Sequence, residues 1–170
     1  TLHVKLFEIT LPPAGSEELQ KQFKEMVTTM AQFYSGMLSV TEMDEESREK
    51  WKRSFTLELA ISNESEEVIF YAGIPDMKAD LFEKQLLAAF PRATLRENPN
   101  DYNIFIENGA SAASYAVPVF SPALSLKTYE AFDSDPFSAL LNSFSKIKKT
   151  GEGASVQIVL APIADYYIKR

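Results

Sequence analysis

The chain has 170 residues, a length that suits one domain with its own hydrophobic core. Its formal net charge of −7 argues against a main role in binding DNA or RNA, because neutralising phosphates takes an excess of lysine and arginine. Cysteine is absent, which excludes a disulfide framework and a thiolate metal site. No apolar stretch approaches the roughly 20 residues of a membrane-spanning helix, and no signal peptide is visible.

The first half of the chain predicts a strand, a helix and a hairpin. Leu2 to Ile9 alternates in polarity, as strands do. Ser16 is a predicted N-cap, and apolar residues at spacings of three and four then continue to Met37, which indicates a long amphipathic helix. A charged connection follows. Two alternating runs, Phe55 to Ile61 and Val68 to Ile74, flank a polar turn and predict a β-hairpin.

A second helix and further strands follow the hairpin. Asp76 is a predicted helix cap, and Pro91 ends the apolar helical pattern that it opens. Alternation resumes at Ala93 to Glu97 and again at Tyr102 to Ile106. The order is β-α-β-β-α-β, so we expect an α+β fold with a ferredoxin-like core over residues 1–107, in which two helices cover one face of an antiparallel sheet.

The last third predicts a β/α/β extension over residues 115–162. Tyr115 to Val119 alternates around a proline, which favours a short or edge strand. Pro136 starts a helix with an apolar stripe to Ile147, and Gly151 is its expected C-terminal cap. Val156 to Leu160 predicts the last strand. No linker-like composition separates this element, so we expect one domain over residues 1–170 whose sheet it extends.

The sequence offers no set of residues typical of catalysis. His3 is the single histidine, so a triad or a zinc site would depend on it. Residues 149–153 contain two glycines but lack the Gly-x-x-x-x-Gly-Lys-Ser/Thr spacing, and they precede a strand instead of a helix. The acidic residues of the connection, Asp44 to Glu46, are expected to be solvated. We therefore predict no catalytic, cofactor-binding or metal-binding residues.

Two further patterns have structural explanations. Glu58 and Glu107 lie within strand patterns and are expected to face water. Phe70 and Tyr71 lie on a predicted central strand, where an RNA-recognition domain would stack bases. That family's glycine-rich and basic pattern is missing here, and the chain is acidic, so core packing explains these aromatic residues better.

One long stretch resembles a known family. It runs from Leu126 through Asp135-Pro136 to Leu141, continues to Gly151-Glu152, and closes at Val156 to Pro162. With the upstream run Ala89 to Ala93, it resembles the segment in front of the motor in bacterial conjugative DNA-transfer, or coupling-type, ATPases of type IV secretion systems. The similarity covers most of the chain from Phe55 onward and rests on the order and spacing of apolar and capping residues.

The resemblance implies a non-catalytic accessory or interaction domain that supports assembly or docking of the motor. It implies protein partners, either other secretion components or the motor itself, with no cofactor and no direct nucleic acid. It also implies a cytoplasmic location at the inner face of the membrane, through flanking segments. A homo-oligomer and a monomer both stay open. The alternatives are a ferredoxin-like domain that binds a small regulatory molecule and, last, an enzyme that uses carboxylates alone.

Overall fold

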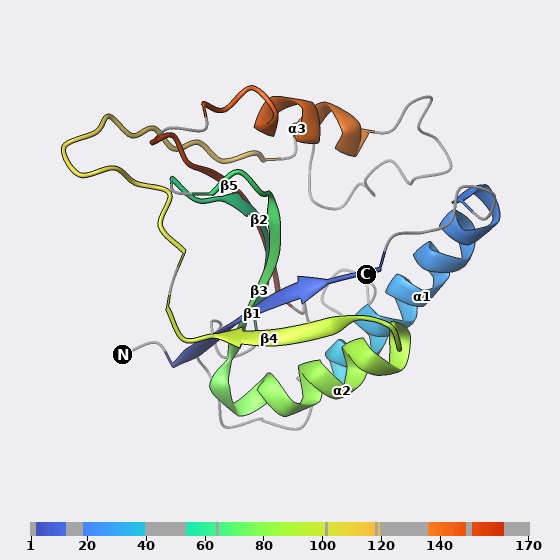
Figure 1. Ribbon diagram of the computed structural model, residues 1–170. Coiled ribbons are helices and arrows are strands. Elements are labelled where there is room, and N and C mark those ends of the chain that lie inside the picture. The colour runs from blue at the N-terminus through green and yellow to red at the C-terminus, as the bar shows by residue number, and fades with distance from the viewer. Residues whose placement is uncertain are drawn as a thin grey trace. The chain divides into compact units, whose positions relative to one another are not determined.

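The computed structural model describes residues 3–12, 19–39, 54–63, 65–100, 102–117, 119, 136–148 and 151–161. The elements follow in the order β1 (Val4–Thr10), α1 (Leu19–Ser39), β2 (Phe55–Ile61), β3 (Ile69–Pro75), the 3-10 turn η2 (Asp76–Lys78), α2 (Ala79–Ala89), β4 (Thr94–Asn98), α3 (Pro136–Phe144) and β5 (Ala154–Leu160). The five strands form one open antiparallel sheet in the order β4-β1-β3-β2-β5 (Figure 1). The predicted α+β class is confirmed.

The first strand lies inside the sheet and holds two distant parts of the chain together. β1 pairs antiparallel with β3, from Val4 opposite Pro75 to Ile9 opposite Phe70. On its other side β1 pairs antiparallel with β4, from Leu6 opposite Asn98 onward. In this register Phe7 and Ile9 of β1 share one face with Ala72 and Ile74 of β3, and a slip by one residue would turn these buried side chains to the other face.

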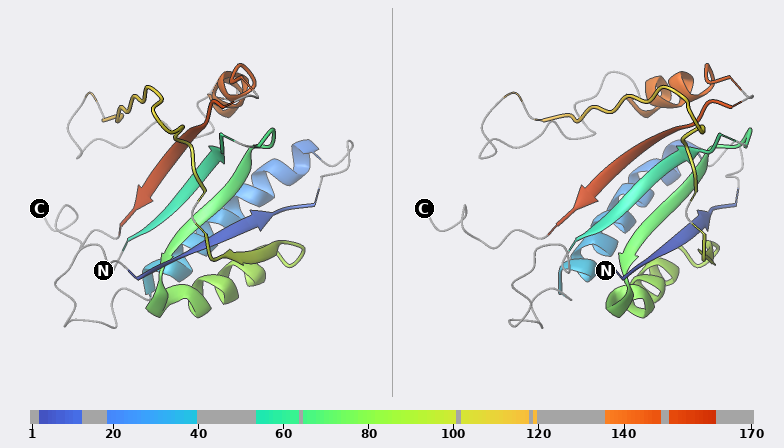
Figure 2. Two further views of the ribbon diagram at one scale, coloured as in Figure 1. Left: turned by 60° about the vertical axis from the view of Figure 1, so that its left-hand side comes forward. Right: turned by 90° about the vertical axis from the view of Figure 1, so that its left-hand side faces the viewer.

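One face of the sheet carries the main core. Phe7 and Ile9 of β1 and Ala72 and Ile74 of β3 are buried there. Helices α1 and α2 lie side by side against this face (Figure 2). They contribute the remaining buried members of the cluster, which are Phe33, Met37, Ala79, Phe82 and Leu86. Burying a large apolar side chain contributes roughly 1.5–3 kcal/mol, so this cluster supplies most of the driving force for folding of the layer.

Aromatic rings join the helices to the sheet. Phe33 of α1 meets Phe82 of α2 edge-on, with the ring centroids 5.8 Å apart. Phe55 of β2 lies 6.3 Å from Phe33 and 6.2 Å from Phe82. Phe7 stacks on Phe82 at 6.0 Å. These spacings fall in the range in which aromatic pairs attract beyond their area burial, so the ring cluster orients both helices on the sheet.

Contacts divide the chain into two units that are not continuous in sequence. The first contains the described residues within Thr1–Leu59, Ile69–Asp101 and Val156–Pro162, and the second those within Ala60–Val68, Tyr102–Ser155 and Ile163–Arg170. The first holds the sheet-and-helix core. Whether the chain behaves as the single domain expected from its composition stays a prediction.

In the second unit, the segment that follows β4 is held by the hairpin turn. The backbone N–H of Asn63 donates to the carbonyl oxygen of Asn103 at 3.0 Å, and the Asn63 side chain donates to the carbonyl oxygen of Phe105. Residues 102–106 are extended without being part of the sheet, so the strand predicted there is wrong. The described residues 115–117 and 119 form no strand either. The predicted β/α/β extension thus reduces to α3 and β5.

Two predicted caps also differ from the structure. Asp76 opens the 3-10 turn η2, and α2 begins only at Ala79 with no side-chain cap. The Asp76 carboxylate lies instead within 3.7 Å of the Lys5 ammonium. Gly151 has a positive φ of 83°, in the turn that leads into β5 and not at the end of α3, which stops at Phe144. The predicted start of α3 at Pro136 and end of α2 before Pro91 are confirmed. The predicted N-cap Ser16 lies outside the described residues.

Candidate functional site

The strongest concentration of buried polarity lies on the face of the sheet opposite to α1 and α2. Glu58 of β2 is only 6% exposed, and it is the buried charged residue among those that the structure describes. Its neighbours in β2, Leu57 and Phe55, pack on the core, so alternation turns Glu58 to the other face. The expectation that Glu58 faces water is therefore wrong.

Side chains and backbone from three neighbouring strands surround this carboxylate. Thr56 Oγ1 donates to Glu58 Oε1 at 2.5 Å, and Gln157 Nε2 of β5 donates to the same oxygen at 2.9 Å. The backbone N–H of Gly73 in β3 donates to Thr56 Oγ1 at 3.2 Å. The result is a continuous chain of hydrogen bonds from β3 through β2 to β5, with Glu58 as the common acceptor, which we call the Glu58 network.

The absence of a side chain at Gly73 makes room for this network. A Cβ atom at that position would lie 2.5 Å from Thr56 Oγ1 and 3.5 Å from Glu58 Oε1. A separation of 2.5 Å is far inside van der Waals contact, so any larger residue would displace the Thr56 hydroxyl. Glycine in a strand interior commonly marks such a close approach.

The hydrogen bonds of the Glu58 network hold its own members in place. Among the described residues, no buried side-chain nitrogen or oxygen lacks a hydrogen-bond partner. A carboxylate that already accepts two hydrogen bonds from fixed neighbours is held in place, whereas a general base has to reach a proton on a substrate. The network ties β5 to β2 through a side-chain contact between residues 99 positions apart in the sequence.

An ion pair lies on the same face of the sheet as the Glu58 network, at the edge formed by β4. Arg96 of β4 donates from Nη2 to Glu8 Oε2 of β1 at 2.5 Å. Tyr71 of β3 lies opposite Glu8 in the β1–β3 register. The hydrogen bond from Arg96 to Glu8, together with the negative charge of Glu8, raises the pKa of the Arg96 guanidinium above its ordinary value. The pair links β4 to β1 across the strands.

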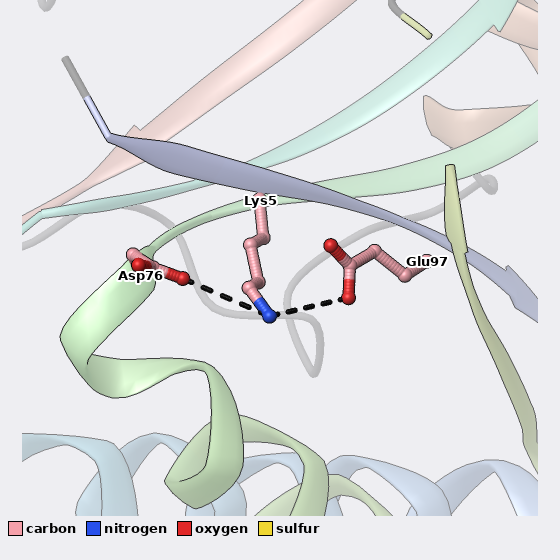
Figure 3. A network of polar contacts seen from close by, with 3 residues as sticks. All are labelled: Lys5, Asp76 and Glu97. Atoms are coloured by element: carbon pink, nitrogen blue, oxygen red, sulfur yellow. Dashed lines mark hydrogen bonds and ion pairs between the residues drawn. The ribbon is translucent and has the colours of Figure 1, made fainter. Parts of the chain in front are cut away.

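A second charged cluster lies on the helix side of β1 (Figure 3). The Lys5 ammonium points between two carboxylates, at 3.2 Å from Glu97 Oε2 of β4 and at 3.7 Å from Asp76 Oδ1 of η2. The hydrogen bond to Glu97 is the main cause of a raised pKa at Lys5, followed by the charge of Glu97 and the weaker pull of Asp76. Solvent reaches all three groups, so the cluster contributes little to stability and mainly fixes the ends of β1 and β4.

The residues weighed as catalytic candidates lie apart from these clusters. His3 is exposed, and its carbonyl oxygen accepts the backbone N–H of Asp76 at 3.0 Å. Glu107 is exposed in a turn, as expected. The Glu152 carboxylate accepts the backbone N–H of Lys148 at 2.9 Å, which is a local turn contact. The acidic run Asp44 to Glu46 and residues 149–150 lie outside the described residues.

Phe70 and Tyr71 of β3 have the packing role that the sequence predicts. Phe70 packs against the main core, and Tyr71 is buried on the opposite face. Neither ring lies open on the sheet as a platform for stacking a base.

The part of the chain that the structure describes offers neither a cluster of metal ligands nor a membrane-spanning helix. Within these ranges, no three His, Cys, Asp or Glu side chains gather closely enough to hold an ion. Within the same ranges, no helix has the length and hydropathy to cross a bilayer.

Comparisons of the chain with models of protein families, with curated proteins and with solved structures returned no match.

Proposed function

We propose that this chain is a non-catalytic accessory domain of a type IV secretion ATPase, one that supports assembly or docking of the motor in conjugative DNA transfer. The observation that carries the proposal is the run from Leu126 to Pro162, with its upstream match at Ala89 to Ala93. In this proposal the domain binds protein partners in the cytoplasm, close to the inner face of the membrane, and the ATP site belongs to another part of the protein.

The contacts of the polar side chains favour a scaffold over an enzyme. The Glu58 network satisfies its own carboxylate, and Lys5 and Arg96 are paired with carboxylates of neighbouring strands. Groups that hold strands together are poor candidates for moving protons, because catalysis needs a group placed against a substrate.

The strand order supports a more specific fold within this proposal. We infer that β1 to β4, in the spatial order β4-β1-β3-β2 with α1 and α2 on one face, form a ferredoxin-like sandwich. The strand β5 then adds a fifth member beside β2. We infer that α3 and β5 are additions to a four-stranded core and that the Glu58 network holds the added strand β5 against β2.

Reading the gene beyond the codon for Arg170 tests the proposal directly. We expect a Gly-x-x-x-x-Gly-Lys-Ser/Thr motif within about a hundred codons, because that spacing lets backbone amides hold the phosphates of ATP. If no such motif follows, the proposal fails.

A second measurement separates an accessory role from a catalytic one. The motor would be purified with and without residues 1–170, and both ATP hydrolysis and assembly state would be measured. We expect removal of the domain to change assembly. Glu58→Gln in the full protein should leave hydrolysis per folded molecule unchanged, and a loss of hydrolysis greater than tenfold in that variant would place Glu58 in the chemistry and contradict the proposal.

The second candidate function is a ferredoxin-like regulatory domain that binds a small molecule. It follows from the fold alone, since ligands of such domains would lie between paired sheets. It predicts that a metabolite raises the melting temperature of the isolated chain, because a ligand of the native state stabilises that state by mass action. A broad metabolite screen without any shift would leave the accessory role as the better account.

A further inference from the structure

The two edges of the sheet differ sharply in length and charge. β4 has five residues, Thr-Leu-Arg-Glu-Asn, and Pro99 follows it directly. β5 has seven residues, Ala-Ser-Val-Gln-Ile-Val-Leu, none of which is ionisable. Natural proteins protect sheet edges with charge, with proline and with short strands, because an open row of N–H and C=O groups invites another strand. β4 is short and charged, whereas β5 is longer and carries no charge.

The side chains of β5 also expose apolar surface. Ile158 is 57% exposed and Val159 is 60% exposed. Successive residues of a strand point to opposite faces, so these two side chains present apolar surface on both sides of the same edge. Within the described residues, β5 is the last strand in the order and pairs on one side only, with β2.

We propose that β5 pairs antiparallel with β5 of a second copy of this chain, about a two-fold axis at Gln157. Gln157 is the central residue of the strand, so the axis brings Val156 opposite Ile158 of the second copy. It likewise brings Ser155 opposite Val159 and Ala154 opposite Leu160. A two-fold interface needs a surface that complements itself, and this strand has small or β-branched apolar residues on both sides of its centre.

The lack of charge along β5 makes this edge a suitable place for two copies to meet. Two chains of net charge −7 repel one another. The stretch from Gly153 to Ala161 nevertheless contains no ionisable residue, so the two strands meet without like charges facing each other. At the axis the two Gln157 amides meet. An amide has two N–H groups and one oxygen, so each can hold Glu58 and also pair with its counterpart.

The same geometry limits the assembly to two chains. Pairing through β5 makes one sheet in which the outer strand at each end is β4. Those ends carry Arg96 and Glu97 and are short, so further strands are discouraged from adding. An interface formed by one pair of seven-residue strands is small, with less than about 1,200 Å² of surface buried in total. We therefore expect a dimer that forms reversibly in the micromolar range. This inference does not depend on the proposed function.

Disulfide trapping tests the register, because the natural chain has no cysteine to interfere. In Gln157→Cys the two new thiols lie opposite each other, at the Cα spacing of about 4.5–5.5 Å that a disulfide accepts. In the control, Val159→Cys, the two thiols are four positions apart along the strands, or about 13 Å, and cannot join. We expect mild oxidation to cross-link the first variant at least tenfold faster than the second, as seen on a non-reducing gel.

Gln157→Cys removes the contact between Gln157 and Glu58, so a double variant that keeps this contact serves as a second test. Ser155→Cys with Val159→Cys leaves Gln157 intact and places each cysteine opposite the other kind in the second copy, so this variant should also cross-link rapidly. Equal cross-linking of Val159→Cys and the two test variants would mean random collision and would overturn the proposed register.

Sedimentation equilibrium of the whole chain supplies an independent readout. We expect Val159→Lys to weaken dimerisation at least tenfold, since the new charge would lie in the interface. Met77→Lys is the matched control, with the same change of charge at an apolar residue that is 67% exposed in η2, and it should dimerise like the natural chain. A natural chain that stays monomeric up to several hundred micromolar refutes the proposal, including the case in which β5 instead captures an extended segment of another protein.

Discussion

Replacing Gly73 by alanine should destabilise the chain through one identifiable contact. The new Cβ would lie 2.5 Å from Thr56 Oγ1, so the threonine hydroxyl has to move. The move breaks the hydrogen bond from the Gly73 N–H, worth about 1 kcal/mol, and the bond to the Glu58 carboxylate, worth about 1.5–3 kcal/mol. Alanine recovers about 0.5–1 kcal/mol through its smaller loss of backbone freedom. The net expected cost is about 1.5–3.5 kcal/mol.

The measurement is a double-mutant cycle by urea denaturation. Gly73→Ala, Thr56→Ala and the double variant would be compared with the natural chain. In the Thr56→Ala background the obstructing hydroxyl is gone, so adding Gly73→Ala should cost about zero or be slightly stabilising. The expected coupling energy is therefore about 2.5–4 kcal/mol, the worth of the two hydrogen bonds, and well above the few tenths seen for independent sites.

A matched glycine supplies the control. Gly36 of α1 faces only the terminal amide of Gln85, a flexible side chain that can turn away. Gly36→Ala should be neutral or stabilise the chain by up to about 1 kcal/mol, because alanine favours helix over glycine. The reasoning is refuted if Gly73→Ala costs the same with and without the Thr56 hydroxyl, since the damage would then arise elsewhere.

Three further outcomes follow from local geometry. A Cβ at Gly153 would lie 2.6 Å from the Cα and the carbonyl oxygen of Ile104, and backbone cannot turn aside, so Gly153→Ala should cost about 1–3 kcal/mol in urea denaturation. Asn108 has a φ of 60°, so Asn108→Ala should cost about 1 kcal/mol by the same assay, whereas Asn108→Gly should cost nothing; equal effects would contradict the role of the backbone angle. Burial raises the pKa of Tyr34, so the stabilisation by its neutral form is complete below the unfolded pKa near 10 and is lost as the pH rises through the folded value. An ultraviolet titration of Tyr34→Phe should therefore lack a late-ionising component that the natural chain, with its seven tyrosines, shows.

Alternation located the first three strands in the sequence, although β1 carries the apolar residues Val4 and Leu6 on its second face as well. Phe7 and Ile9 in β1, and Ala72 and Ile74 in β3, fall on one face by simple alternation, and that face is the core. The end of α2 was predicted because proline cannot continue a helix, and α2 stops at Ala89 before Pro91.

Features that depend on residues far away in the sequence could not be predicted. Alternation placed Glu58 on the face of β2 opposite to Leu57. It could not show that the Glu58 side chain is buried on that face, because the residue that donates to it, Gln157, lies 99 positions away in the sequence. The segment from Tyr102 to Ile106 alternates like a strand, yet its backbone bonds go to the turn at Asn63. The periodicity of apolar residues shows which side chains share a face. It does not show which groups the backbone hydrogen-bonds to, because those partners depend on the rest of the fold.

The central position of β1 has a consequence for synthesis. β1 leaves the ribosome before its partner strands, and Glu8 can pair with Arg96 only after a further 88 residues have been made. At about 5–20 residues per second, the wait is roughly 4 to 18 s. Until Phe70 and Ala72 of β3 have been made, Phe7 and Ile9 have neither β3 nor β4 beside them. The growing chain therefore exposes an unpaired apolar strand for several seconds, and contact with neighbouring nascent chains is the hazard that its production must avoid.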